Sequence, residues 1–322
     1  MTMLDETAKG VFAISATPFA EDGSVDLEST DRLVEFYLDS GVTGLTILGV
    51  MGEAPKLAPD ESVAFTKRVL AAVDGKVPVV VGVSSPAFNP MAALTRQVMD
   101  LGAAGVMVAP ASGINTDEKI ENYFHSVCDL LVDVPIVLQD YPPSTGVWFS
   151  TALLNRLFAD LPSLKVLKHE DWPGLRKVTQ FRAAEAAGDR RRVSVLVGNG
   201  GLFLPQELAR GVDGAMTGFA FPEMLVRVCD LHAGGDPDIA EDLFDAHLPL
   251  VRYEQQVGIG LAIRKETLRR RGVIASATTR APGPSLDAND HLELTRLIDR
   301  LQRALASKGL ESSFYPPSTE AA

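Results

Sequence analysis

Eight short apolar segments, each followed by a stretch of helical character, constrain the fold of this chain more than any other feature. Residues 79–81, 136–138 and 195–197 are apolar without interruption, which is typical of parallel strands covered on both faces. Turn-forming residues separate the segments from the stretches around them. The predicted strands are residues 11–17, 44–48, 77–83, 105–109, 135–139, 164–168, 193–197 and 214–218.

Helical stretches follow every predicted strand, so eight strand–helix pairs occupy about 225 residues, close to the ~250 typical of a (β/α)8 barrel. A doubly wound sheet usually has fewer strands and a glycine-rich loop after the first one, whereas this chain has Thr17-Pro18-Phe19-Ala20 there. We therefore predict an α/β fold, a (β/α)8 TIM barrel with a C-terminal helical extension. The predicted helices are residues 27–38, 59–73, 91–101, 117–131, 151–158, 174–187, 203–209 and 222–231.

The pattern divides the chain into three parts. Residues 1–235 are predicted to form the barrel. Residues 236–310 are predicted to form a helical region packed on it, with helices at 239–256, 260–271 and 291–306. The polar tail 311–322 contains Pro316-Pro317 and little apolar surface, so it is predicted to be flexible.

Composition limits the partners of this protein. The 322 residues include 30 Lys and Arg against 42 Asp and Glu, and the net charge of -12 repels nucleic acid and anionic membranes. The basic run Arg190-Arg191-Arg192 is interpreted as a solvated loop. Cys128 and Cys229 are too few for a disulfide framework or a clustered zinc site. Without a signal-like start or an apolar stretch of membrane-spanning length, we predict a cytoplasmic protein with neither nucleic-acid nor membrane partners.

Lys168 is the main candidate for chemistry, because it lies late in a predicted strand with apolar neighbours. Burial in apolar surroundings lowers the pKa of a lysine and provides a free amine that attacks carbonyls. Strand alternation places Lys168 and Glu170 on one face and His169 on the other. The alternative interpretation is a structural ion pair between Lys168 and Glu170, and the residues alone leave both open.

Other polar and glycine residues follow the predicted strands, where barrels of this kind carry their sites. Gln139 and Tyr141 share a face after the fifth strand. The histidines are scattered along helices, so no metal site is predicted. Candidate residues for binding are Gly49, Val50, Met51, Gly52, Ser112, Gly198, Asn199 and Met216.

Several motifs in order give the chain a family resemblance from residue 11 to residue 303. They are Gly49-x-x-Gly52-Glu53, the segment 142–146, Lys168, Gly198-Asn199-Gly200-Gly201-Leu202 and Gly214-Ala215-Met216-Thr217. With this set the chain resembles the dihydrodipicolinate synthase and N-acetylneuraminate lyase family, barrels that form a Schiff base with a 2-keto acid.

The resemblance implies an imine between Lys168 and the keto carbon of a small 2-keto acid, which needs no cofactor. The protonated imine stabilises the carbanion formed when a C–C bond breaks or a C3 proton leaves. Backbone amides of the loop from Gly49 to Gly52 would hold the substrate carboxylate, and the Met216 carbonyl would face the imine. The resemblance also implies a homo-oligomer, either a tetramer built from dimers or a dimer.

Departures from the family pattern bear on the reaction. Members that act on pyruvate usually carry two hydroxyl residues between the two glycines, whereas this chain has Val50 and Met51. An ungapped match puts Gln139 where the family has its catalytic tyrosine, with Tyr141 two residues later. The loop after the fourth strand, where synthases carry a tyrosine, reads Ala111-Ser112.

One branch of the family is similar at these positions, the 2-keto-3-deoxy sugar-acid dehydratases such as L-2-keto-3-deoxyarabonate dehydratases. Those enzymes are similar in Gln139-Asp140-x-Pro142 and in Lys168-x-Glu170. Dehydration removes a C3 proton and expels a hydroxyl, and Glu170 or a bound water could transfer those protons. The alternatives are a pyruvate-dependent aldolase and a catalytically silent barrel that binds a keto acid. Polar candidates for the distal part of the substrate are Ser112, Ser144, Thr145 and Asn199.

Overall fold

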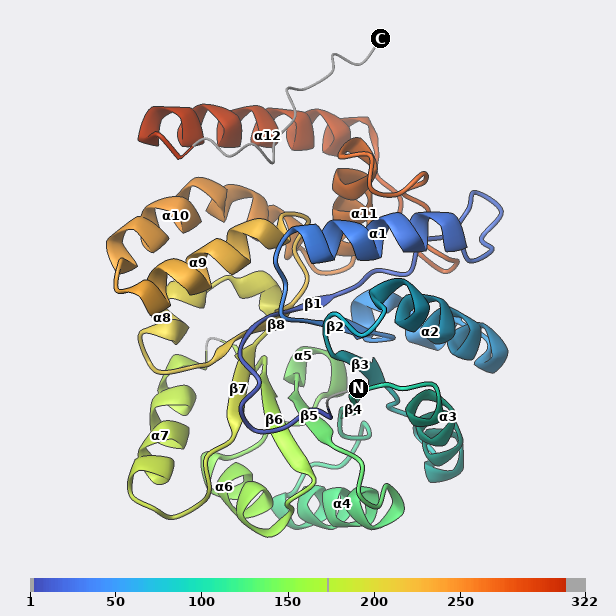
Figure 1. Ribbon diagram of the computed structural model, residues 1–322, viewed down its shortest axis with the longest axis vertical. Coiled ribbons are helices and arrows are strands. Elements are labelled where there is room, and N and C mark those ends of the chain that lie inside the picture. The colour runs from blue at the N-terminus through green and yellow to red at the C-terminus, as the bar shows by residue number, and fades with distance from the viewer. Residues whose placement is uncertain (1–2, 173, 311–322) are drawn as a thin grey trace.

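The computed structural model describes residues 3–172 and 174–310. Eight parallel strands form a closed barrel in the order β1 to β8, so the predicted fold class is confirmed. Figure 1 shows the strands at the centre with helices around them. The strands are β1 (Gly10–Ile14), β2 (Gly44–Ile47), β3 (Val79–Gly82), β4 (Gly105–Val108), β5 (Ile136–Asp140), β6 (Leu164–His169), β7 (Ser194–Val197) and β8 (Gly214–Thr217).

Alternation along the strands separates two apolar cores. Side chains such as Phe12, Val166 and Leu196 fill the barrel interior, while their strand neighbours pack against the helices. Glycine is required at position 44, because a Cβ there would lie 2.3 Å from the Phe12 ring. The large ring of β1 therefore fills the space beside β2, and the interior is packed rather than hollow.

Amphipathic helices cover the outside of the barrel. Apart from the short α5, their boundaries match the predicted ones to within a few residues at either end. The helices of the barrel are α1 (Leu27–Asp39), α2 (Pro59–Val73), α3 (Phe88–Asp100), α4 (Asp117–Leu130), α5 (Pro142–Thr145), α6 (Thr151–Asp160), α7 (Leu175–Ala186), α8 (Leu204–Leu208) and α9 (Pro222–Gly234).

Local differences from the sequence prediction concentrate where the strands end. The first strand was predicted to reach Thr17 but ends at Ile14, and the Thr17 hydroxyl instead donates to the Gly52 carbonyl at 2.7 Å. Unpredicted short turns follow the strands: η1 (Val50–Gly52), η2 (Ala54–Lys56), α5 and η3 (Asn199–Gly201). Periodicity cannot reveal turns this short, because three or four residues span only about one helical repeat.

Three further helices follow the barrel: α10 (Pro237–Glu254), α11 (Gly260–Arg270) and α12 (Ala288–Lys308). Helix α10 packs on both α9 and α12, and α12 forms the end of the molecule farthest from α4 (Figure 1). Among the described helices, none is both long and apolar enough to cross a membrane. The predicted flexible tail, 311–322, lies outside the described residues.

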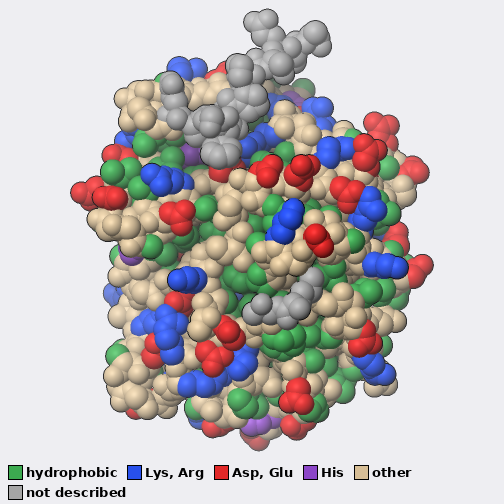
Figure 2. All heavy atoms as spheres, viewed as in Figure 1, with side chains coloured by type: hydrophobic (Ala, Val, Ile, Leu, Met, Phe, Trp, Pro, Cys, Tyr) green, Lys and Arg blue, Asp and Glu red, His purple; other side chains and the backbone are tan. Residues whose placement is uncertain are grey.

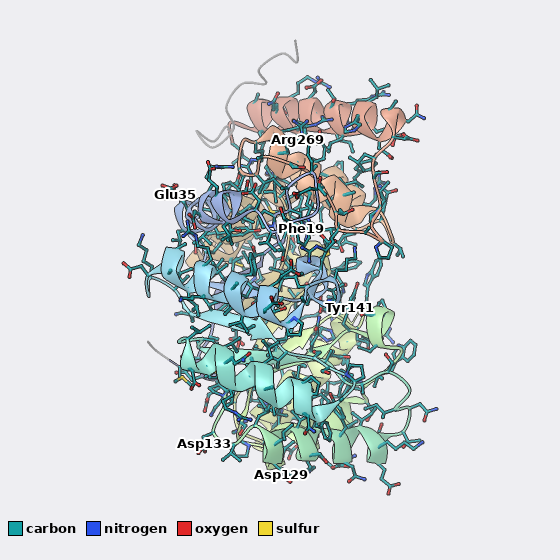
Figure 3. The ribbon with its side chains drawn as sticks, turned by 90° about the vertical axis from the view of Figure 1, so that its right-hand side faces the viewer. Phe19, Glu35, Asp129, Asp133, Tyr141 and Arg269 are labelled. Carbon is teal, nitrogen blue, oxygen red and sulfur yellow. The ribbon has the colours of Figure 1, made fainter. Side chains whose placement is uncertain are left out.

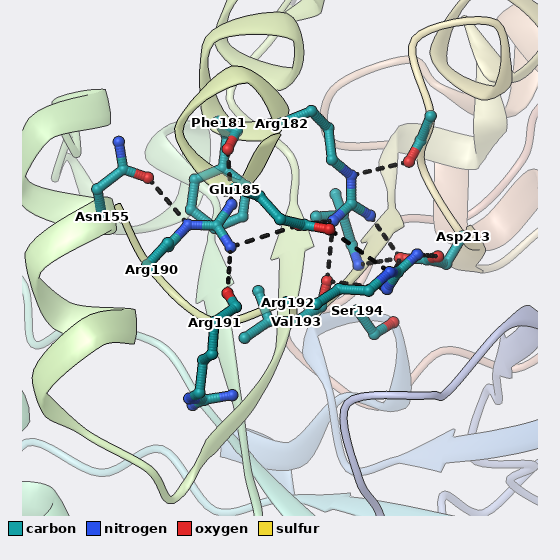
Figure 4. A network of polar contacts seen from close by, with 12 residues as sticks. Asn155, Phe181, Arg182, Glu185, Arg190, Arg191, Arg192, Val193, Ser194 and Asp213 are labelled. Carbon is teal, nitrogen blue, oxygen red and sulfur yellow. Dashed lines mark hydrogen bonds and ion pairs between the residues drawn. The ribbon is translucent and has the colours of Figure 1, made fainter. Parts of the chain in front are cut away.

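The basic run Arg190-Arg191-Arg192 is only in part the solvated loop that was predicted, because the Arg192 side chain is exposed but Arg190 is buried. Arg190 is 7% exposed, lies 3.6 Å over the Phe181 ring and donates to the Phe181 carbonyl. Figure 4 shows Glu185 paired with Arg190 and Asp213 paired with Arg192. The ion pairs of this run therefore fix the connection between α7 and β7.

Acidic and basic side chains are interspersed on the face of the molecule that Figure 2 shows.

Candidate active site

A cavity of about 1050 Å³ opens at the carboxyl ends of the strands. Loops after β2, β4, β5, β7 and β8 line it together with the end of β6, and the segment between α10 and α11 contributes a further wall. This is the end at which barrels of this class place their chemistry. Its volume is ample for a small organic acid.

Lys168 points into this cavity from β6. Its Nζ lies 2.9 Å from Oε2 of Glu170, and the two side chains are 5% and 8% exposed. Strand alternation put both on the same face, as predicted. The ion pair with Glu170, which the sequence left open beside the nucleophile, is present. Lys168 thus both lines the cavity and forms an ion pair with Glu170.

Glu170 is held by residues from two neighbouring strands. The Gln139 amide donates to Glu170 Oε2 at 2.7 Å, and the strand register places Gln139 opposite Lys168. A Cβ at position 198 would lie 2.1 Å from Glu170 Oε1, so Gly198 gives the carboxylate its space. The Asn199 side chain donates to the Glu170 carbonyl at 3.1 Å. These contacts fix the carboxylate beside the amine.

His169 lies on the outer face, as alternation predicted, and is not among the residues that line the cavity. Its Nδ1 is 3.5 Å from Asp140 Oδ2, and that oxygen also accepts from Lys177 at 2.7 Å. The buried carboxylate of Asp140 thus joins the ends of β5 and β6 from outside the barrel. This contact stabilises the strand ends that carry Gln139 and Lys168.

Tyr141 lines the cavity directly after β5. The chain turns there, with φ −126° and ψ 75°, into helix α5, and Figure 3 shows Tyr141 next to that helix. Burial and the negative charge of Glu170 raise the pKa of the Tyr141 phenol above its usual range, with Arg264 opposing the shift. The phenol therefore stays protonated and can donate a hydrogen bond near neutral pH.

The glycine-containing loop after β2 contributes Gly49, Val50 and Met51 to the cavity wall. Gly52 differs from expectation, because its N–H donates to the Gly49 carbonyl at 3.0 Å and its carbonyl accepts from Thr17. The amide of Gly52 is thus used within the turn. Amides at the start of a helical turn have no partner inside that turn, so the turn itself does not use those of Val50 and Met51.

Two other predicted binding residues lie outside the cavity wall. Met216 is fully buried in the barrel interior, and the residues that follow it, Thr217 and Gly218, line the cavity instead. Gly198 contacts Glu170 rather than the open space. Met216 faces the barrel interior, as Val166 does, but it lies below the cavity, so the motif alone did not locate the wall. Ser112, Ser144, Thr145 and Asn199 do line the cavity.

The motif residue Glu53 forms a network that the sequence analysis missed. Its Oε1 accepts from Lys265 at 2.6 Å, and its Oε2 accepts from Lys56 at 2.8 Å and from the Arg280 amide at 3.0 Å. Lys265 also lies 4.4 Å from the centre of the Phe19 ring, and Figure 3 shows Phe19 close to the C-terminal helices. Glu53 thereby connects the loop after β2 to α11.

One surface cluster brings together groups that can bind metals. Ligand atoms of Glu121, His125 and Asp160 lie within 4.8 Å of one another. Both carboxylate oxygens of Glu121 already accept from Arg156, each at 3.1 Å. We interpret the cluster as an ion-paired surface between α4 and α6, which the spacing of the histidines in the sequence did not reveal.

Comparison with known proteins places this arrangement in a family. Residues 7–301 match the model of the dihydrodipicolinate synthetase family. The chain belongs to this family. The resemblance inferred from the motifs is confirmed, and the chain is a member of a lyase family.

Similar proteins include both a dehydratase and synthases. The chain is 32% identical over 297 residues to L-2-keto-3-deoxyarabonate dehydratase of Azospirillum brasilense, covering 91% of this chain and 94% of that protein. It is 32% identical over 254 residues to 4-hydroxy-tetrahydrodipicolinate synthase of Pelobacter propionicus, covering 78% and 83%. A crystal structure described as dihydrodipicolinate synthase of Rhodopseudomonas palustris is 47% identical, with a TM-score of 0.91 and coverage of 93% and 100%.

Proposed function

We propose that this protein is a lyase that binds a 2-keto acid as an imine on Lys168 and dehydrates a 2-keto-3-deoxy sugar acid. The observation that carries the proposal is the pairing of Lys168 Nζ with Glu170 Oε2 at 2.9 Å inside a large cavity. An amine nucleophile and a proton acceptor within hydrogen-bond reach are the two groups that imine formation requires.

Imine formation begins with transfer of a proton from the Lys168 ammonium to Glu170. The free amine attacks C2 of the keto acid, and the carbinolamine then loses water to give the protonated imine. The carbonyl oxygen leaves in that water, and Glu170 can supply the proton that it needs. The imine itself accepts electrons in the following step, so this scheme uses no cofactor or metal.

Dehydration then proceeds through an enamine. A base removes one C3 proton, and the electron pair of the C–H bond moves toward the imine nitrogen. The enamine expels the C4 hydroxyl as water when an acid protonates it, which leaves a conjugated imine. Hydrolysis releases the unsaturated keto acid and restores Lys168. We assign the proton transfers to Glu170, which Gln139 holds in place.

The substrate carboxylate is proposed to bind the amides of Val50 and Met51. Both residues line the cavity, and their apolar side chains provide no hydroxyl for a proton relay. Gln139 occupies the position at which the family resemblance implies a tyrosine. Dehydration can operate without that hydroxyl relay, since it does not need to activate an aldehyde oxygen. The relative named as a dehydratase, similar over most of both chains, supports this reaction.

A pyruvate-dependent aldolase or synthase is the second candidate, because other relatives carry synthase names. In that case Lys168 forms the same imine, and a C–C bond is made or broken in place of the C–O bond. A silent barrel that binds a keto acid without turnover is the third.

Borohydride trapping tests the imine. We expect intact-mass analysis to show an adduct with pyruvate and with 2-keto-3-deoxy acids. The adduct should be lost in Lys168→Ala and kept in Lys165→Ala, a matched control earlier on β6 whose lysine pairs with Glu6. Persistence of the adduct in Lys168→Ala, or no adduct with any 2-keto acid, contradicts the proposal. Release of a dehydrated keto acid supports the dehydratase, and release of pyruvate with an aldehyde supports the aldolase.

A further inference from the structure

Arg264 of α11 contributes a buried guanidinium to the cavity wall, although α11 comes after the barrel in the sequence. Its side chain is 2% exposed, and its Nε donates to Glu254 Oε2 at 3.0 Å. The Nη1 of the same group is buried and has no hydrogen-bond partner among the described residues. The mechanism proposed above does not use this group.

Gly218, at the end of β8, makes room for this nitrogen. A Cβ at position 218 would lie 2.2 Å from Arg264 Nη1, so a larger residue would displace the guanidinium. A buried donor without an acceptor is costly, and nearly all such groups in native proteins are paired. An unpaired donor in a residue that lines an open cavity is a place where a ligand can supply the acceptor.

Gln255 extends the same wall. It lies in the segment between α10 and α11 and lines the cavity. A Cβ at position 200 would lie 2.3 Å from its Nε2, so the amide of Gln255 lies directly against Gly200, beside Asn199. The C-terminal segment thus contributes two hydrogen-bonding side chains to a cavity whose proposed chemistry comes from the barrel.

Arg264 also lies on the side of the cavity where the chemistry is proposed. The Tyr141 phenol responds to the charges of both Glu170 and Arg264, which raise and lower its pKa respectively. Geometry agrees, because Gly218 at the end of β8 lies against Arg264 Nη1 and Gly198 after the neighbouring strand β7 lies against Glu170 Oε1. We therefore expect the distal end of a ligand longer than pyruvate to extend toward Arg264 and Gln255.

Charge balance restricts what can bind there. Glu254 has a fully buried side chain and already neutralises Arg264. A second carboxylate on the ligand would therefore add an uncompensated negative charge in a poorly solvated place, next to Glu254. A hydroxyl group accepts a hydrogen bond without adding charge.

We propose that Arg264 and Gln255 bind the distal hydroxyl groups of the substrate and select a hydroxylated monocarboxylic 2-keto acid over a dicarboxylic one. This inference rests on the proposed function, because it assumes that the keto end lies at Lys168. Arg264 and Gln255 are specificity-determining residues in this scheme and take no part in bond making or breaking.

Three probes test the inference by borohydride trapping and by kinetics: pyruvate, a five-carbon 2-keto-3-deoxy sugar acid, and 2-ketoglutarate, which has the same length but a distal carboxylate. For the wild type we expect half-saturation at a lower concentration of the hydroxylated acid than of 2-ketoglutarate. Arg264→Lys keeps the charge beside Glu254 but removes the guanidinium fork, and Gln255→Ala removes the amide. Each should raise the KM for the hydroxylated acid about tenfold, with a smaller change in kcat.

Pyruvate trapping should stay within about twofold of the wild type in both variants, because pyruvate has no distal hydroxyl. Arg252→Lys, an exposed arginine near the end of α10, is the matched control. If Arg264→Lys fails to fold, Gln255→Ala decides the question alone. A KM unchanged in the folded variants, an equal loss for pyruvate, or a preference for 2-ketoglutarate overturns the inference. Failure of the wild type to form any adduct overturns the proposed function instead.

Discussion

At the residue scale, the site depends on one carboxylate. Glu170 Oε2 is within hydrogen-bond distance of both Lys168 Nζ and the Gln139 amide. Gly198 leaves the space that Oε1 needs. In the proposed reaction this carboxylate first accepts a proton from Lys168 and then transfers protons to and from the substrate. Its ability to accept a proton is therefore expected to matter more for activity than the size of its side chain.

Glu170→Gln tests that role, because glutamine keeps the size of the side chain but cannot accept a proton. We expect kcat for dehydration to fall about 10²- to 10⁴-fold, the usual contribution of a general acid–base. Steady-state kinetics measures the fall. The adduct with pyruvate should still form on long incubation, because Lys168 remains. Full activity in this variant would contradict the assignment of the proton transfers to Glu170.

At the element scale, the loop after β2 is attached to α11 through Glu53. Glu53 and Lys265 are 2% and 0% exposed and are separated by 212 residues in the chain. The C-terminal segment therefore has two connections to the cavity: it holds the loop that carries Val50 and Met51, and it supplies Arg264. Packing of α11 on the barrel and the shape of the cavity are coupled.

Removal of one partner of this buried pair should destabilise the protein. We expect Lys265→Met to lower the free energy of unfolding by about 3 kcal/mol, since it leaves a buried carboxylate with less compensation. Urea unfolding measures this change. The double variant Glu53→Gln, Lys265→Met should lose less than the sum of the single changes, because each removes the same contact. Strict additivity would show that the two residues do not interact energetically.

At the scale of the whole molecule, His247 links stability to pH. It lies on α10, where its ring packs against Phe219 and Phe221 and its Nδ1 is 2.9 Å from the Leu243 carbonyl. Burial lowers the pKa of His247 from 6.5 to about 4. The unfolded chain therefore binds a proton at this residue more readily than the folded protein. The stability that comes from keeping His247 neutral in the folded protein is present above pH 6.5 and is lost as the pH falls toward 4.

His247→Gln removes this titration. In the wild type, the stability due to His247 falls from about pH 6.5 downward, at about 1.4 kcal/mol for each pH unit. Between pH 7 and pH 5 the free energy of unfolding therefore falls by about 2 kcal/mol because of this residue. We expect the variant to lose about 2 kcal/mol less than the wild type over that interval in chemical denaturation. His232→Gln, on the last turn of α9, controls for the substitution itself. Equal acid sensitivity of His247→Gln and the wild type would refute the assignment.

The architecture and part of the site followed from local patterns. Apolar runs of strand length, separated by helical stretches, specified the barrel, because side-chain periodicity depends only on neighbouring residues. Alternation also placed Lys168 with Glu170 and turned His169 outward, as the structure shows. The predicted oligomer, either tetramer or dimer, and the predicted localisation stay predictions.

Contacts between distant parts of the chain were decided only by the tertiary structure. No local pattern could show that Glu53 meets Lys265, that Arg264 reaches the end of β8 or that Met216 lies beneath the cavity rather than in its wall. These contacts depend on how α11 packs on the barrel and on the short turns after each strand. Sequence by itself determined which face each strand residue takes, since that choice is local. The packing of elements far apart in the chain determined what each of those faces meets.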